Sequence, residues 1–184
     1  MLQKGERIMR IRSSALLGAI LFALPVVAAE GDFKAMFVKH WQTAKEFTLA
    51  VAEAMPAEDY DFKPNKDELS FGQLMVHIAA QNSDSCATAT GTKVPPTMPS
   101  SSGPVPAMDK QAAIKLLNLS FDTCAKELEA MSPEQWNKEV YKFRGQPVLA
   151  SEAMWYTFTH MAHHRGQAEV YLRAKNIKPP GWRF

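Results

Sequence analysis

The 184-residue sequence has only two cysteines, Cys86 and Cys124, and no large surplus of either charge. Two cysteines are too few for a disulfide-rich scaffold or for a zinc site made of cysteines alone. The formal net charge is +2, but residues 1–29 carry a balance of +3, which leaves −1 for residues 30–184. Because capture of nucleic acid by charge requires a concentrated basic surface, this near-neutral body argues against it. The composition, 46% hydrophobic and 22% charged, is typical of a single globular domain and excludes disordered, collagen-like and coiled-coil chains.

Long hydrophobic runs are also scarce, and the one near the start has the features of a secretory signal peptide. Basic residues come first, an uncharged apolar run follows over residues 15–27, and small residues precede Glu30. The apolar run is shorter than the about 20 residues that a transmembrane helix needs. We therefore expect a signal peptide over residues 1–29, a mature domain over residues 30–184 and a periplasmic or secreted location. An uncleaved N-terminal anchor is the alternative interpretation.

The mature chain shows apolar residues at spacings of three and four, which predict amphipathic helices. We expect a first helix that is capped by Asp32 and ended by Pro56. A second helix is expected from Ser70 to Thr90, with a capping box between Ser70 and Gln73. A third helix is expected to be capped by Asp109, and a fourth to run from Ser151 to Asn176. A short helical turn is expected to carry Trp136, and a small hairpin is expected around Arg144 and Gly145.

Residues 91–107 contain five prolines and a serine run, which predict a long extended connection. A connection of this length permits two successive helices to run in the same direction. We therefore expect an all-α protein, a four-helix bundle with a long crossover connection between helices 2 and 3.

Three of the five histidines crowd into the predicted fourth helix. His160 and His164 lie four residues apart, so their imidazoles can point at one site, whereas His163 is rotated from His164 by about 100°. Such a pair suits metal ligation, but two surface or hydrogen-bonded histidines are the simpler interpretation. A third ligand could come from His77 on the second helix. His40 is the competing residue, although a surface histidine is the more ordinary interpretation there.

The pair differs from the HExxH motif of zinc proteases, because Met161 stands where the general-base glutamate would be. Thr157, Gln167 and Tyr171 fall on the same predicted helix face as the pair and are candidates for contacts with the ligands or a substrate. Asp84 and Glu152 are candidates for a general base, with solvated surface charges as the alternative. No catalytic residue is assigned.

Two segments together resemble a known family. The segment Ser70-Phe71-Gly72-Gln73-Leu74-Met75-Val76-His77-Ile78-Ala79 resembles the second-helix motif of the DinB-like superfamily, and the segment from His160 to Gln167 is similar to its fourth-helix signature. This resemblance implies a four-helix bundle with a long connection between helices 2 and 3. It also implies a divalent metal ion held by His77, His160 and His164. Characterised relatives include thiol-dependent transferases and isomerases.

Two classes of function follow from these observations. A metal with open coordination positions would suit a metal-dependent hydrolase or a thiol transferase acting on a small-molecule substrate. The alternative is a non-catalytic metal-binding or structural bundle. Imidazole ligands suit Zn, Ni, Fe or Cu, and we expect one divalent ion (Zn, Ni or Fe) whose identity the sequence does not determine. We expect no nucleic-acid partner and no stable membrane insertion after signal cleavage, and we leave open whether the protein forms a homodimer.

The two cysteines occupy equivalent places in the predicted second and third helices. If these helices run parallel, Cys86 and Cys124 lie at similar depth, whereas antiparallel helices would separate them widely. An oxidising compartment favours a disulfide where the two Cα atoms approach within about 7 Å. The sequence thus permits an intrachain bond, and two buried free thiols are the alternative.

Overall fold

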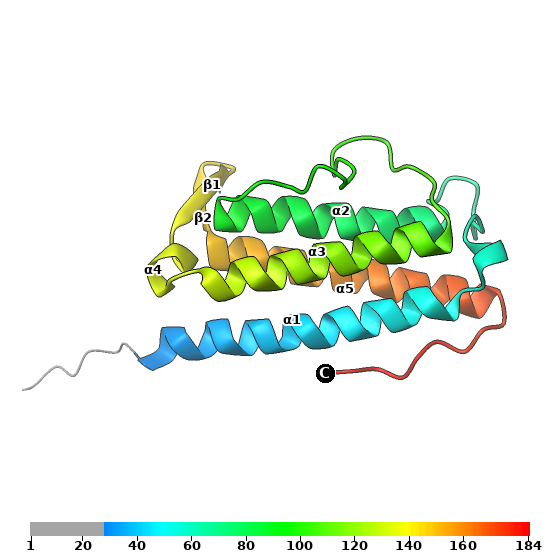
Figure 1. The fold of residues 1–184 in the computed structure, drawn as a ribbon, viewed down its shortest axis with the longest axis horizontal. Helices are drawn as coiled ribbons and strands as arrows, with labels where there is room; N and C mark the ends of the chain where they lie inside the picture. Colours follow the sequence, from blue (N-terminus) through cyan, green and yellow to red (C-terminus); the bar gives the residue numbers. More distant parts are fainter. Residues whose placement is uncertain (1–27) are drawn as a thin grey trace, which may run out of the picture.

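Helices make up most of residues 28–184, the part of the chain that the computed structural model describes, with side chains from Phe33 onward (Figure 1). The elements in chain order are α1 (Ala28–Ala54), the 3-10 turn η1 (Ala57–Asp59), α2 (Phe71–Thr90), α3 (Lys110–Ala130), the short α4 (Pro133–Trp136), β1 (Glu139–Phe143), β2 (Gln146–Leu149) and α5 (Ala150–Ala174). The described chain is therefore mostly helical, with five α-helices and one two-stranded sheet. The predicted signal peptide lies outside the described residues except for Ala28 and Ala29.

The four long helices enclose one apolar core. Helix α2 packs against α3 and α5, and α1 packs against the same two helices from the other side. Trp41 of α1 is buried against Phe121 of α3, and its indole N–H donates to the Phe121 carbonyl oxygen at 3.2 Å. This core fixes the long helices relative to one another and so holds the side chains that α2 and α5 present to each other. Among the helices of residues 28–184, none has both the length and the apolar character needed to cross a bilayer.

The predicted helix ends are confirmed in α2 and α3. The capping box of Ser70 and Gln73 starts α2, and Gly91, with a φ of 73°, ends it in the left-handed conformation that glycine adopts without strain. The carboxylate of Asp109 accepts a hydrogen bond at the start of α3. The prediction for Asp32 is wrong, because α1 begins at Ala28 and Asp32 lies inside it. Ala28, Ala29 and Glu30 are all good helix formers, so the helix extends across Gly31 to the polar residue that could have capped it.

Figure 1 shows α2 and α3 running in the same direction, with residues 91–109 returning along the outside of the two helices. A disulfide between Cys86 and Cys124 joins them, with a Cα–Cα distance of 5.7 Å. The predicted intrachain bond is therefore present in the structure, and the alternative of two free thiols is wrong. The equal depth of the two residues in helices of the same direction explains how the bond can form.

The predicted turn and hairpin lead directly into α5. Strand β1 pairs with β2 in antiparallel fashion, and Arg144 and Gly145 both have positive φ, as a tight two-residue hairpin turn requires. Helix α5 starts immediately after β2, and the Glu152 carboxylate accepts a hydrogen bond from the Leu149 N–H at 2.8 Å. The helix ends at Ala174, two residues before Asn176, which takes the left-handed conformation.

Candidate metal centre

Helix α2 positions His77, and its first turn is tightly fixed. The Ser70 side chain accepts a hydrogen bond from the Gln73 N–H at 3.2 Å, and the Gln73 side chain accepts one from the Ser70 N–H at 3.0 Å. Gly72 lies so close to neighbouring backbone that an added Cβ would stand 2.8 Å from the Met108 carbonyl oxygen. Because only glycine avoids this clash, the start of α2 packs closely against the loop before α3. His77 follows five residues after Gly72, in a well-anchored part of the helix.

Helix α5 positions His160 and His164 one turn apart. Between them, Met161 is fully buried, and its sulfur accepts a hydrogen bond from the buried Thr48 hydroxyl of α1. The guanidinium of Arg165 lies over the Phe47 ring at 4.4 Å from its centroid, a cation–π contact that also ties α5 to α1. Met161 and Arg165 each follow a histidine by one residue, so these contacts with α1 lie about 100° around α5 from the two histidines, which face α2.

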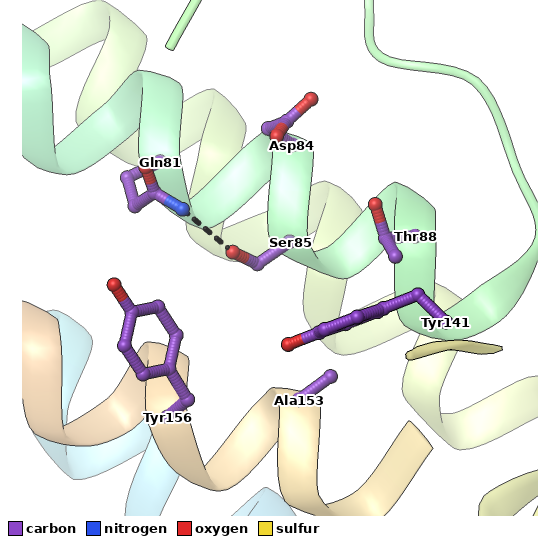
Figure 2. A pocket seen from close by; sticks show the side chains of 7 residues that line it. All are labelled: Gln81, Asp84, Ser85, Thr88, Tyr141, Ala153 and Tyr156. Carbon is purple, nitrogen blue, oxygen red and sulfur yellow. Dashed lines mark hydrogen bonds between the residues drawn. The ribbon is translucent and has the colours of Figure 1, made fainter. Parts of the chain in front are cut away.

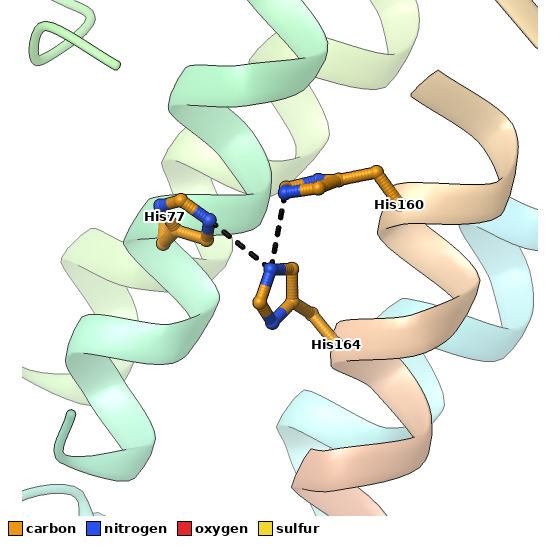
Figure 3. A group of neighbouring side chains, drawn as sticks. All are labelled: His77, His160 and His164. Carbon is orange, nitrogen blue, oxygen red and sulfur yellow. Dashed lines mark hydrogen bonds between the residues drawn. The ribbon is translucent and has the colours of Figure 1, made fainter. Parts of the chain in front are cut away.

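The three histidines meet between α2 and α5 (Figure 3). The Nε2 atom of His164 lies 3.2 Å from Nε2 of His77 and 3.1 Å from Nε2 of His160. One ring nitrogen from each residue falls within 4.8 Å of the other two. Four nitrogens bound tetrahedrally at about 2.0–2.1 Å from one ion would be about 3.3 Å apart, so this spacing suits a single small cation.

All three imidazoles are partly buried and are held in the neutral form. Burial lowers the pKa of His77, and the proximity of His164 lowers it further. Burial together with the neighbouring histidines lowers the pKa of His160 to about 4. Burial also lowers the pKa of His164, while its hydrogen bond to Gln167 partly opposes the shift. Neutral imidazole is the form that binds metals, so these lowered pKa values favour the form that a cation needs.

Hydrogen bonding within the cluster supports the same conclusion. The Gln167 side-chain oxygen lies 2.7 Å from Nδ1 of His164, so Nδ1 carries the proton and Nε2 presents its lone pair to the centre. Nδ1 of His160 is buried without a hydrogen-bond partner. The Nε2 atom of His164 faces the Nε2 atoms of both His77 and His160 with a single lone pair, whereas one cation between the three Nε2 atoms would use one lone pair from each ring. The residues present fit a metal ion.

The other residues that sequence reasoning placed near the histidines have different positions. Gln167 contacts His164 as expected, but the Thr157 hydroxyl donates to the Ala153 carbonyl and the Tyr171 hydroxyl donates to the Leu69 carbonyl. Both hydroxyls thus stabilise the scaffold. Thr157 is fully buried because it faces the core side of α5, a distinction that helical spacing alone did not make.

Two further histidines lie outside the three-nitrogen group. The ring of His163 packs against His164 with 5.0 Å between ring centroids, but His163 is exposed and is not one of the three converging residues. The ring of His40 lies 4.4 Å from that of Phe184, near the C-terminus. Neither position is suited to complete the site.

A cavity of about 340 Å³ lies one helical turn from the histidines (Figure 2). Its lining comes from α2, α5 and β1 and consists of Gln81, Asp84, Ser85, Thr88, Tyr141, Ala153 and Tyr156. Tyr156 connects it to the histidines, because its ring centroid lies 5.8 Å from that of His160. The sequence reasoning missed Tyr156, although its spacing of four residues before His160 places it on the same side of the helix.

The two acidic candidates for a general base take other roles. Asp84 lies at the rim of this cavity, seven residues or about 10 Å along α2 from His77. Glu152 is occupied in accepting the hydrogen bond that starts α5. Neither carboxylate belongs to the group of converging side chains.

Comparisons with known proteins agree with this architecture. Two solved structures are similar to the chain, each at 20% sequence identity. A DinB-like protein from Bacillus subtilis has a TM-score of 0.64, and the match covers 80% of this chain and 97% of that one. A DinB-like protein from Bacillus cereus has a TM-score of 0.67, and the match covers 79% of this chain and 95% of that one. At this identity the likeness establishes the fold alone. No curated protein matches the chain. The DinB superfamily model matches residues 40–168, which include all three converging histidines, and the chain therefore belongs to the DinB superfamily.

Proposed function

We propose that this protein is an exported metalloenzyme that binds one divalent ion, Zn, Ni or Fe, through His77, His160 and His164. The single observation that carries the proposal is the convergence of three neutral imidazole nitrogens beside a cavity. Three protein ligands next to an open space are the usual arrangement of a catalytic site, whereas structural zinc sites are closed by a fourth protein ligand. Among the described residues, the group contains three donors and no fourth histidine, cysteine or carboxylate.

The reaction we infer is either hydrolysis of a small molecule or transfer of a thiol to it. A bound divalent ion would supply Lewis-acid activation of water, a thiol or a carbonyl group. Residues of the chain itself orient the metal-binding side chains. Gln167 fixes the ring of His164 with Nε2 toward the centre, and the contacts of Met161 and Arg165 with α1 keep α5 in place. The cavity beside Tyr156 provides the space in which a substrate would lie.

The proposal includes the setting and the architecture. We propose that residues 1–29 direct export and are removed, so that residues 30–184 act in the periplasm or outside the cell. A disulfide in the folded domain supports an oxidising compartment. The direction of α2 and α3 supports a four-helix bundle with a crossover connection, in which α1, α2, α3 and α5 are the bundle helices. The partner we propose is a small-molecule substrate, with no nucleic acid and no stable membrane insertion after cleavage.

Coordination spectroscopy separates the enzyme from a non-catalytic metal-binding bundle. The purified protein is loaded with Co²⁺, and its visible absorption is recorded with and without azide. An enzyme-like site has an exchangeable position, so azide should shift the spectrum in a saturable manner. A spectrum that azide leaves unchanged would favour a closed structural site. His160→Ala should lose the Co²⁺ spectrum, while His163→Ala, one residue from His164, should keep it.

A further inference from the structure

The cavity beside the histidines has a distinctive chemistry. Asp84 is the only residue of its lining that carries a full charge, and the remaining polar lining residues are neutral amides and hydroxyls. Two tyrosines face it from different elements, Tyr141 from β1 and Tyr156 from α5 (Figure 2). Figure 2 also shows the Gln81 amide donating to the Ser85 hydroxyl at 2.9 Å, so part of the α2 wall is already hydrogen-bonded.

Such a lining favours a cation over an anion. A carboxylate attracts an ammonium group, and the face of a tyrosine ring attracts it through the ring quadrupole. The cavity lining contains no lysine, arginine or histidine that could bind a carboxylate or phosphate. Tyr141 and Tyr156 are 40% and 55% exposed, so an arriving ligand can reach them.

We propose that this cavity is a binding site for small organic ammonium ions, and that the substrate of the enzyme is an amine-bearing carboxylate or carbonyl compound. The ammonium group lies in the cavity that Asp84 and the two tyrosine rings line. The substrate-class part of the proposal rests on the proposed metal function, because the carboxylate or carbonyl end is the part directed toward the histidines. Ammonium binding itself depends only on the cavity.

The dimensions of the site agree with a ligand that has two ends. Asp84 lies about 10 Å along α2 from His77, and Tyr156 lies one turn from His160 on the facing helix. A ligand as long as 6-aminohexanoate can therefore place its ammonium group at Asp84 and extend past Tyr156 to the three histidines. A shorter monofunctional amine reaches only the cavity.

Three probes test the proposal by NMR titration of the isotope-labelled protein, which measures weak binding. These are n-butylammonium, its uncharged counterpart n-butanol, and 6-aminohexanoate, each added to metal-free and Zn²⁺-loaded protein. We expect n-butylammonium to bind to both forms and to shift signals of the cavity residues, with n-butanol binding at least fivefold more weakly. We expect Zn²⁺ to strengthen binding of 6-aminohexanoate but not of n-butylammonium.

Matched variants localise the binding. Asp84→Asn should weaken n-butylammonium binding about fivefold, the upper range for an exposed ion pair, whereas Asp67→Asn in the exposed loop before α2 should have no effect. Tyr141→Ala should weaken it about threefold through loss of the cation–π contact, whereas Phe143→Ala on the same hairpin should not. All four side chains are exposed, and circular dichroism verifies that each variant is folded.

The outcomes separate the two proposals. Equal binding of n-butylammonium and n-butanol, or an Asp84→Asn protein that binds like the parent, would overturn the ammonium site even if Zn²⁺ binds normally. If n-butylammonium binds selectively but Zn²⁺ does not increase the affinity for 6-aminohexanoate, the ammonium site is retained and the proposed substrate class is overturned. Failure of the protein to bind Zn²⁺ at all would contradict the proposed function and leave the result with n-butylammonium to decide the cavity site.

Discussion

Helix α2 presents two very different regions to its neighbours. Toward α3 it carries Cys86, which is 1% exposed and bonded covalently to Cys124. Toward α5 it carries His77, which is only partly buried and meets two further histidines beside a cavity. The disulfide completes its bonding within the protein, whereas the histidines leave lone pairs directed at one another. One region therefore stabilises the helix pair, and we propose that the other binds a cation.

The largest expected effect concerns the cross-linked region. Replacing both cysteines by alanine removes a link between residues 38 apart in sequence, which is expected to cost about 4 kcal/mol in the free energy of unfolding. Denaturant unfolding of the double variant and the parent measures the loss. Since the two regions are distinct, the folded double variant should still bind one metal ion.

Thiol chemistry provides the direct check on that cross-link. Titration of the unreduced, denatured protein should detect no reactive thiol. Two thiols per chain, or a loss of unfolding free energy below about 1 kcal/mol in the double variant, would contradict the structural role of this region.

The histidine region should make the metal-free protein sensitive to acid. Histidines of the unfolded chain have a pKa near 6.5, whereas burial and the neighbouring histidines lower the pKa of His160 to about 4 in the folded protein. As the pH falls below 6.5, the unfolded chain binds protons that the folded cluster does not, so the free energy of unfolding decreases until about pH 4. After allowance for solvent screening of these half-exposed rings, we expect a loss of about 1–2 kcal/mol.

Denaturant unfolding in the presence of a chelator, at several pH values between 7 and 4, measures this dependence. His160→Gln should have a shallower decrease than the parent, because glutamine does not titrate. An identical pH dependence in the two proteins would show that His160 is not held neutral by its surroundings.

The smallest expected effect tests how the ring of His164 is oriented. Gln167→Ala removes the hydrogen bond to Nδ1, and loss of such a partner to a metal-binding histidine reduces metal affinity about tenfold. Competition with a chromophoric chelator measures the affinity. Glu169→Ala, on the same helix but outside the histidine group, is the matched control and should leave it unchanged. Equal affinities for the two variants would mean that Gln167 does not orient the ring.

Much of the fold was predictable because its signals are local. Capping residues such as Ser70 and Asp109 act within one turn, and Arg144 and Gly145 form a turn that depends on only two residues. The start of α1 was predicted wrongly because Asp32 is a good cap in isolation, but the helix formers Ala28, Ala29 and Glu30 precede it and are already helical. Local signals competed there, and sequence alone did not identify the stronger one.

The site was only partly predictable, since it depends on contacts between distant segments. The spacing of His160 and His164 indicated a pair, but only the packing of α2 against α5 brings His77 to 3.2 Å from His164. Tyr141 could not be connected to the site from sequence, because the hairpin that carries it reaches the cavity through tertiary packing. Thr157 was predicted to contact the ligands or a substrate but faces the core, because a small rotation around the helix separates residues that face the core from residues that face the site.

The central claim is that three histidines from two helices hold one divalent ion. The most direct measurement is the metal content of the parent protein and of His77→Ala, His160→Ala, His164→Ala and His163→Ala after loading and removal of free metal. We predict about one ion per chain in the parent and in His163→Ala, and a sharp loss in each of the other three variants. Full metal content in His77→Ala would contradict the account, because the site would then not require α2.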